Sequence, residues 1–152
     1  MSDNWICVIP RDPHFVPTQD AILRAERLLS EIAPDADSIS SETADTVQFR
    51  DCGSNLETIR CQECAAEISP EWWADQMGDE DYWSDGFQLE PITLPCGHIA
   101  PSLNALYYNF DQGFSRFMLE AMNPQTGQLE ARQVLNLEGA LGCPVKVIYQ
   151  HL

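Results

Sequence analysis

Two pairs of metal-binding side chains restrict how the middle of this chain can fold. Cys61 and Cys64 are separated by two residues, Cys96 and His98 by one, and 31 residues lie between the pairs. A two-residue spacer lets both thiolates face one ion, and Zn²⁺ prefers sulfur and imidazole ligands in a closed tetrahedron. The pattern therefore predicts a zinc site that brings two distant segments together.

The fourth ligand of this predicted site has two candidates, His98 and Cys52, which lies nine residues before Cys61. Four protein ligands leave no open position, so the ion would be structural, with a binding energy on the order of 10 kcal/mol in model sites. The alternative is that these cysteines are reduced thiols and His98 is a surface imidazole. Cys7 and Cys143 lie in predicted strands and are expected in the core.

Negative charge is concentrated in the same part of the chain. Eight basic and 24 acidic residues give a net charge of −16, and the segment from Cys61 to Ser115 holds ten acids and no Lys or Arg. Nucleic acid and anionic membranes would be repelled, so the natural complement is a basic protein partner. The alternative is that the acidity serves only solubility.

Hydrophobic periodicity predicts strands and helices on both sides of the acidic segment. The expected strands are residues 4–10, 46–51, 56–61, 114–122 and 143–152, and the expected helices are residues 18–34, 69–78 and 126–142. In the strand 46–51, Val47 and Phe49 alternate with Gln48 and Arg50, which is typical of a half-buried strand. The polar residues 35–45 predict a turn-rich loop.

A β-α-β unit is thus expected at each end of the chain. This arrangement predicts an α+β fold of the ferredoxin-like class, in which the two units bracket an inserted zinc-knuckle lobe. At 152 residues the chain is expected to form a single domain, residues 1–152, with residues 61–98 as the inserted acidic zinc-binding lobe.

Aromatic side chains are interspersed with carboxylates in the acidic segment, and this mixture is typical of protein-binding surfaces. Trp72 and Trp73 are about 100° apart on the expected helix, so one should pack inward while the other stays near the surface. The alternative is that the aromatics only fill a small core. The predicted partner-binding residues are Trp72, Trp73, Asp75, Asp79, Glu80, Asp81, Trp83 and Asp85.

Signatures of catalysis, membrane insertion and secretion are not found in the sequence. It has no nucleophile elbow, zinc-protease helix, phosphate-binding loop or dinucleotide motif, so we expect no enzyme activity. It has no run of about 18 apolar residues, and its start, MSDNWICVIPRD, lacks the pattern of a secretory signal. The expectation is a cytoplasmic protein.

Several short stretches occur together in this chain: CQECAAEI, the double tryptophan, LPCGH, SLNALYYNFDQGF, the later Asn-Pro and LGCPVKVI. Together they resemble a family of small acidic bacterial proteins with a Cys-x2-Cys zinc knuckle. The resemblance covers most of the chain and implies a zinc-knuckle protein. In that family the second cysteine element is often Cys-Cys-Gly, whereas this chain has Cys96-Gly97-His98, so His98 would replace the second cysteine.

Small acidic bacterial proteins without catalytic motifs are often immunity proteins that neutralise a toxin domain. By this analogy, the sequence leads to the hypothesis of an inhibitory binding protein that occludes the active site of a cationic toxin or effector domain. The alternative is a zinc-containing adaptor or housekeeping module whose acidity serves only solubility.

Overall fold

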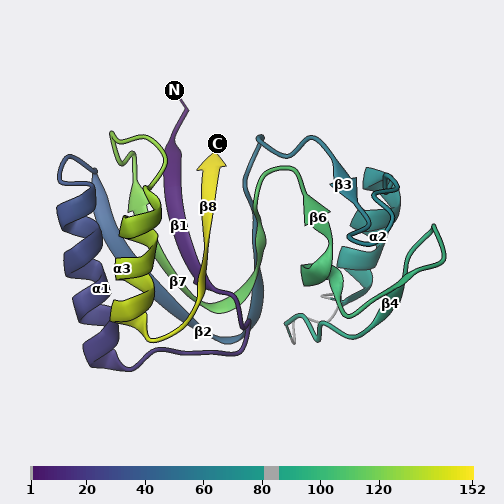
Figure 1. Ribbon diagram of the computed structural model, residues 1–152, viewed down its shortest axis with the longest axis horizontal. Helices are drawn as coiled ribbons and strands as arrows, with labels where there is room; N and C mark the ends of the chain where they lie inside the picture. The colour runs from purple at the N-terminus through teal and green to yellow at the C-terminus, as the bar shows by residue number, and fades with distance from the viewer. Residues whose placement is uncertain (1, 81–85) are drawn as a thin grey trace.

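The computed structural model, drawn in Figure 1, describes residues 2–80 and 86–152. Within these ranges the chain forms an α+β fold with three α-helices, a four-stranded antiparallel sheet and two small two-stranded antiparallel sheets. No helix there is both long enough and apolar enough to cross a membrane. The elements in chain order are β1 (Asn4–Pro10), α1 (Gln19–Ile32), β2 (Ser38–Arg50), β3 (Ile59–Arg60), α2 (Pro70–Glu80), β4 (Ile92–Thr93), β5 (Ile99–Ala100), the 3₁₀ turn η1 (Leu103–Ala105), β6 (Tyr107–Tyr108), β7 (Gly113–Met122), α3 (Ala131–Leu141) and β8 (Val145–His151).

The main sheet has the strand order β2-β7-β1-β8, and every neighbouring pair is antiparallel. Helix α1 connects β1 to β2, and α3 connects β7 to β8, so both predicted β-α-β units are present. Strand β7 lies between β1 and β2, which brings the second half of the chain into the middle of the first unit.

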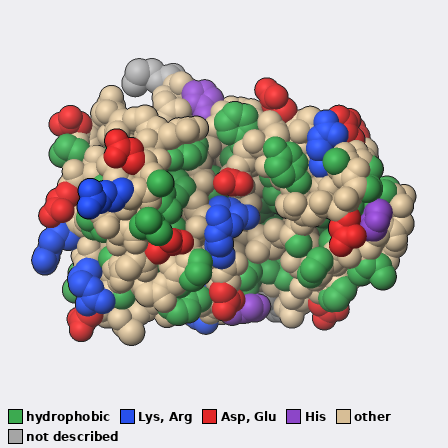
Figure 2. Space-filling model, in the orientation of Figure 1, with side chains coloured by type: hydrophobic (Ala, Val, Ile, Leu, Met, Phe, Trp, Pro, Cys, Tyr) green, Lys and Arg blue, Asp and Glu red, His purple; other side chains and the backbone are tan. Residues whose placement is uncertain are grey.

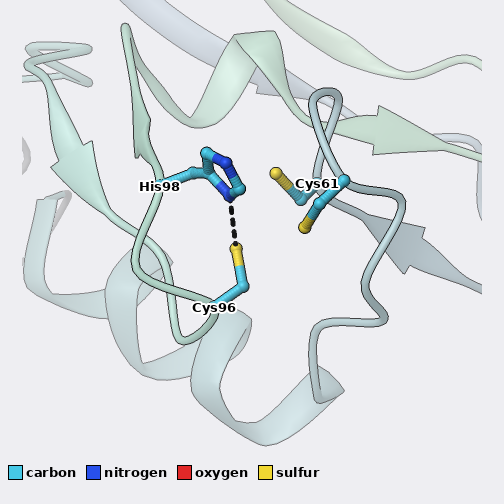
Figure 3. A group of neighbouring side chains, drawn as sticks. Cys61, Cys96 and His98 are labelled. Carbon is cyan, nitrogen blue, oxygen red and sulfur yellow. Dashed lines mark hydrogen bonds between the residues drawn. The ribbon is translucent and has the colours of Figure 1, made fainter.

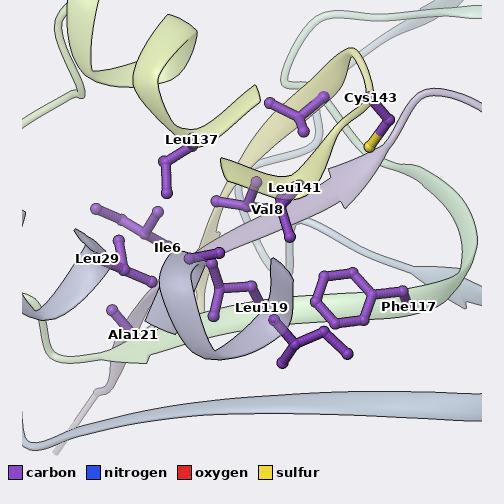
Figure 4. Packing of buried hydrophobic residues seen from close by; sticks show 12 residues of the cluster. Ile6, Val8, Leu29, Phe117, Leu119, Ala121, Leu137, Leu141 and Cys143 are labelled. Carbon is purple, nitrogen blue, oxygen red and sulfur yellow. The ribbon is translucent and has the colours of Figure 1, made fainter. Parts of the chain in front are cut away.

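The helices α1 and α3 pack on one face of this sheet and enclose the larger core, as Figure 4 shows. Leu29 of α1 and Leu137 of α3 meet Ile6 of β1 and Leu119 of β7 there, and all four are at most 2% exposed. Helix α1 begins as predicted, because the Thr18 hydroxyl accepts a hydrogen bond from the Ala21 N–H at 3.2 Å.

The opposite face of the sheet carries a smaller cluster of Cys7, Ile9, Cys52 and Ile148. Cys7 and Cys143 are buried as predicted, in the smaller and the larger cluster respectively. Burial raises the pKa of the Cys7 thiol to about 12, so this cysteine behaves as a neutral, apolar core residue.

A second lobe is formed by residues 56–110, which lie between β2 and β7 and are called the small lobe below. It appears to the right in Figure 1 and contains α2 and the two-stranded sheets β3-β6 and β4-β5. Its core includes Ile59, Leu103 and Tyr108, and the long strands contribute Val47 and Phe114 to the same cluster. The two lobes are therefore joined through β2 and β7, each of which enters both cores.

The prediction of a loop at residues 35–45 was wrong, because β2 already begins at Ser38. Strand β2 is an edge strand that pairs with β7 in the main sheet. Its polar side chains can therefore face solvent while its backbone keeps the hydrogen bonds to β7. Arg50, expected on the polar side of a half-buried strand, is only 8% exposed. Its guanidinium pairs with Glu42 at 3.1 Å and donates to the Ser115 hydroxyl at 3.3 Å.

Gly78 was expected to end the second helix, but α2 continues to Glu80. Gly78 does not adopt the left-handed conformation that a helix-ending glycine takes, so the helix passes through it. The predicted start is confirmed, since the Trp72 N–H donates to the Ser69 hydroxyl at 3.1 Å and Pro70 occupies the first turn.

Candidate metal centre and the acidic surface beside it

The first cysteine pair lies on the turn of a tight hairpin formed by residues 59–68. The Ile68 N–H donates to the Ile59 carbonyl at 2.9 Å, and the Cys61 N–H donates to the Ala66 carbonyl at 3.0 Å. Ala65 has a φ of 61°, a left-handed value that closes the turn. This backbone presents Cys61, which is buried, and Cys64, which is exposed, at the same end of the hairpin.

The second pair lies on the turn between β4 and β5. The Leu94 N–H donates to the His98 carbonyl at 2.8 Å, and the Gly97 N–H donates to the Leu94 carbonyl at 2.9 Å. Gly97 has a φ of 97°, where a side chain would be strained, and this sharp turn lets Cys96 and His98 lie side by side. Figure 3 shows both side chains turned towards Cys61 on the opposite hairpin.

The four predicted ligands come together in one cluster. The sulfur atoms of Cys61, Cys64 and Cys96 and a ring nitrogen of His98 all lie within 4.8 Å of one another. Sulfur atoms at zinc-bond length from one tetrahedral ion are about 3.8 Å apart, so a small closure would complete the shell. Cys52 does not belong to this cluster, because it is buried in the smaller core of the main sheet and contacts Gln112.

The backbone of the hairpin favours a thiolate at Cys61. Its pKa is lowered, mainly by the N–H groups of Cys64 and Glu63, and the Glu63 N–H lies 3.4 Å from the Cys61 sulfur. At Cys64 the Ala66 N–H lowers the pKa of the thiol. Desolvation and the neighbouring thiols of Cys96 and Cys61 act in the opposite direction and prevail, so the pKa of Cys64 is raised. Metal-binding cysteines must lose their protons, and amide groups directed at the sulfur support that state.

The imidazole of His98 has its two nitrogens in different surroundings. Nδ1 lies 3.5 Å from the Cys96 sulfur, and Nε2 lies 3.9 Å from a carboxylate oxygen of Glu63. In this orientation Nδ1 points into the cluster and Nε2 faces the carboxylate of Glu63. The same arrangement occurs in metal sites where a carboxylate supports the ligand histidine. Glu63, a neighbour of the knuckle, was not singled out from the sequence.

The two adjacent tryptophans are both partly buried and both pack against the small-lobe core, so they are less different from each other than the sequence led us to expect. Trp73 makes edge-on contacts with Phe49, with ring centres 5.6 Å apart, and with Tyr108 at 6.1 Å. Its indole N–H donates to the Tyr108 hydroxyl at 3.1 Å, and that hydroxyl donates to the Leu103 carbonyl at 2.7 Å. Half-buried Trp73 thus serves mainly the packing of the lobe.

The carboxylates of α2 form a stripe along its exposed side. Glu71, Asp75 and Asp79 follow one another at four-residue spacing and are all exposed, so their side chains line one face of the helix. Glu80 is the last residue of α2. The other predicted partner-binding residues, Asp81, Trp83 and Asp85, lie outside the described residues.

Positive charge is distributed differently. In Figure 2, the Lys and Arg side chains on this face lie mainly over the helices of the main sheet and the centre of the molecule, with some basic charge also over the small lobe, and hydrophobic side chains reach the surface over both parts. The sequence places no Lys or Arg between Cys61 and Ser115. Arg60, just before this segment, is paired with Glu67 at 2.9 Å.

Comparison with protein-family models, with curated proteins and with solved structures found no match for this chain. The class of protein therefore rests on the fold and the cluster themselves: an α+β protein with a candidate Cys₃His metal site.

Proposed function

We propose that this protein binds a cationic protein partner through the small lobe and inhibits it, as an immunity protein neutralises a toxin domain by covering its active site. The observation that carries the proposal is the stripe of Glu71, Asp75 and Asp79 on a helix whose surroundings in the sequence contain no base. Such a surface accelerates association with a basic partner and repels other acidic molecules.

The same proposal gives the cluster a structural role. Cys61, Cys64, Cys96 and His98 would hold a Zn²⁺ ion that joins the two hairpins and, through Cys64 and the following residues, the start of α2. With four protein ligands the ion would stabilise the lobe and would not bind a substrate. Its contribution would offset the mutual repulsion of the carboxylates in this segment.

We also assign the main sheet to the ferredoxin-like class. The strand order β2-β7-β1-β8, the two helical crossovers and the packing of α1 and α3 on one face support this assignment. The small lobe would then be an insertion between the second and third strands of that fold.

An alternative function is supported by the packing of the tryptophans. Because Trp72 and Trp73 both contact the small-lobe core, they are explained without a partner, as expected for a zinc-containing adaptor whose acidity serves solubility. This alternative predicts a partner without strong positive charge and an interaction that added salt hardly changes.

Affinity purification from the native host distinguishes the two functions. Tagged wild-type protein is compared with the double variant Asp75→Lys/Asp79→Lys on α2 and with Asp20→Lys/Glu31→Lys on α1, which changes the net charge equally on another exposed surface. The proposal predicts a basic protein that is released by salt, is lost with the α2 variant and is retained by the α1 variant.

Neutralisation is then tested by expressing the captured protein in a foreign host, alone and together with this chain. We expect toxicity that co-expression relieves. A captured protein that is acidic, or that binds the α2 variant as well as the wild type, contradicts the proposed binding surface. A basic partner without toxicity keeps the surface but rejects the immunity role.

A further inference from the structure

An apolar groove of about 350 Å³ lies on the small lobe beside α2. Leu56, Ile59, Ile68 and the ring of Trp73 line it, and Ala74 of α2 forms part of its edge. This volume is at the lower end of the range of ligand pockets, roughly 300 to 1,000 Å³, and suits one or two side chains. The sequence did not single out this groove, although its walls come from the single stretch 56–74, because only the fold shows that the hairpin and the start of α2 leave a space between them.

The rim of this groove carries negative charge. Glu57 and Glu67 line it, and both are exposed. Glu67 is paired with Arg60 at 2.9 Å, so Glu57 is the rim carboxylate that contributes most to this charge. Ala74 is followed directly by Asp75, the middle member of the acidic stripe of α2, so the stripe passes beside the edge of the groove. An apolar floor bordered by carboxylates is complementary to an apolar side chain flanked by cations, since burial of the side chain and attraction at the rim act together.

From this complementarity we infer that the groove receives an apolar side chain of the partner, carried on a segment rich in Lys and Arg. The inference rests on the proposed function, for which it names the contact. A second copy of this chain fits less well, because each copy carries a net charge of −16 and the rims would repel each other.

The groove is built on the hairpin that carries the first cysteine pair. Ile59 and Ile68 are opposite each other on its two arms, joined by the hydrogen bond from the Ile68 N–H, and the Cys61–Cys64 turn closes its end. Any ion that fixes this turn also fixes two walls of the groove. Binding of the partner segment therefore depends on the metal without any contact to it.

Three peptides test the inference. Each is titrated into the ¹⁵N-labelled full chain, and the amide signals of the protein are followed by NMR. The peptides are Lys-Lys-Leu-Lys-Lys, Lys-Lys-Ser-Lys-Lys and Glu-Glu-Leu-Glu-Glu. We expect the first peptide to shift the amide signals of Thr58, Ile68 and Ala74, the serine peptide to bind roughly tenfold more weakly, and the acidic peptide to have no effect. Equal shifts with the leucine and serine peptides, or shifts confined to the α2 stripe, overturn the groove as the contact.

A matched pair of variants locates the site. Ala74→Arg fills and charges the edge of the groove, whereas Ala131→Arg makes the same change at an exposed helical position in the other lobe. The first should weaken binding of the leucine peptide by about tenfold or more, and the second by less than about twofold. Equal effects of the two variants reject the groove.

Failure of the groove as a contact can be distinguished from failure of the proposed function. A partner that is lost with Asp75→Lys/Asp79→Lys but retained by Ala74→Arg leaves the acidic surface in place and rejects only the groove. Loss of the partner with Ala74→Arg and retention with Ala131→Arg supports both. A partner retained by every variant rejects both.

Discussion

The main sheet and the small lobe are held together by different means. The main sheet has long strands, two covering helices and a core of aliphatic side chains contributed by all of these elements. In the part that the structure describes, the small lobe has strands of two residues, one α-helix, which is acidic, and a core rich in aromatic rings. Such short strands provide few ladder hydrogen bonds, so the lobe relies on its buried core and, by our proposal, on a metal ion held at Cys61. The comparison leads to the hypothesis that the main sheet is stabilised by burial and strand pairing, whereas the small lobe adds a metal clamp to its own buried core.

Removal of metal should give the largest difference in stability between the small lobe and the main sheet. With a zinc-binding energy on the order of 10 kcal/mol in model sites, chelation should unfold the small lobe and leave the main sheet folded. Hydrogen exchange should show loss of protection at Ile59, Ile68 and Tyr108 but retained protection in β1. Uniform protection before and after chelation would contradict the comparison.

A matched pair of cysteine variants tests the same point without chelator. Cys61→Ala removes a ligand from the cluster, whereas Cys143→Ala removes a buried thiol from the core of the main sheet. Only the first should lower the zinc content of the purified chain.

Truncation of Phe117 should give the next largest effect, and it acts on the main sheet. This ring is fully buried between the helices and the sheet. Phe117→Ala should lower the free energy of unfolding by about 3–5 kcal/mol, measured by urea denaturation. Leu135→Ala, at a position 65% exposed, is the control and should change it by less than about 0.5 kcal/mol. A small effect of Phe117→Ala would mean that this core contributes less than its burial implies.

Loss of one hydroxyl should weaken the small lobe by an intermediate amount. Tyr108→Phe leaves the Trp73 indole N–H and the Leu103 carbonyl without their partner and should cost about 1–3 kcal/mol. Tyr107→Phe makes the same change at the adjacent position, which is 46% exposed, and should be nearly neutral. Equal urea midpoints for the two variants would show that the hydrogen-bonded pair does not stabilise the lobe.

The smallest expected effect concerns pH and the edge of the main sheet. Burial raises the pKa of Glu120 above its ordinary 4.5, with Glu42 adding to the rise, although the Ser40 hydroxyl opposes it. The folded state therefore binds this proton more strongly than the unfolded state, so the contribution of Glu120 to stability falls as pH rises from 4.5 through the folded pKa.

Glu120→Gln has no carboxylate and so removes this loss. The variant should have a higher free energy of unfolding than the wild type, by less than about 0.5 kcal/mol, and this gain should be larger at pH 7 than at pH 4. Urea denaturation at the two pH values gives the comparison, with the exposed Glu31→Gln as the control. A gain that is larger at pH 4 would reverse the assigned sign.

The sequence predicted the main sheet better than the small lobe, for physical reasons. Helix α1, strand β7 and strand β8 bury one periodic face against a core, so their hydrophobic patterns carry the information. The first part of β2 has no such pattern, because it is an edge strand whose order comes from pairing with β7, far along the chain. The two-residue strands are too short to show any periodicity.

The candidate site shows the same contrast. The cluster of Cys61, Cys64, Cys96 and His98 was predicted from spacing, because ligand chemistry is local to each pair. The choice of His98 over Cys52 required the fold, since only packing shows that Cys52 points into the main-sheet core. The groove beside Trp73 also required the fold, because Glu57 and Glu67 are ordinary surface acids until the hairpin places them on one rim.

The central claim is that one ion, held by the two hairpins, fixes the acidic lobe. X-ray absorption at the zinc edge, combined with metal analysis of the purified full chain, tests it most directly. The account predicts one zinc per chain with three sulfur ligands at about 2.3 Å and one nitrogen ligand at about 2.0 Å. A chain that stays metal-free when supplied with zinc, or a shell dominated by oxygen, would contradict it.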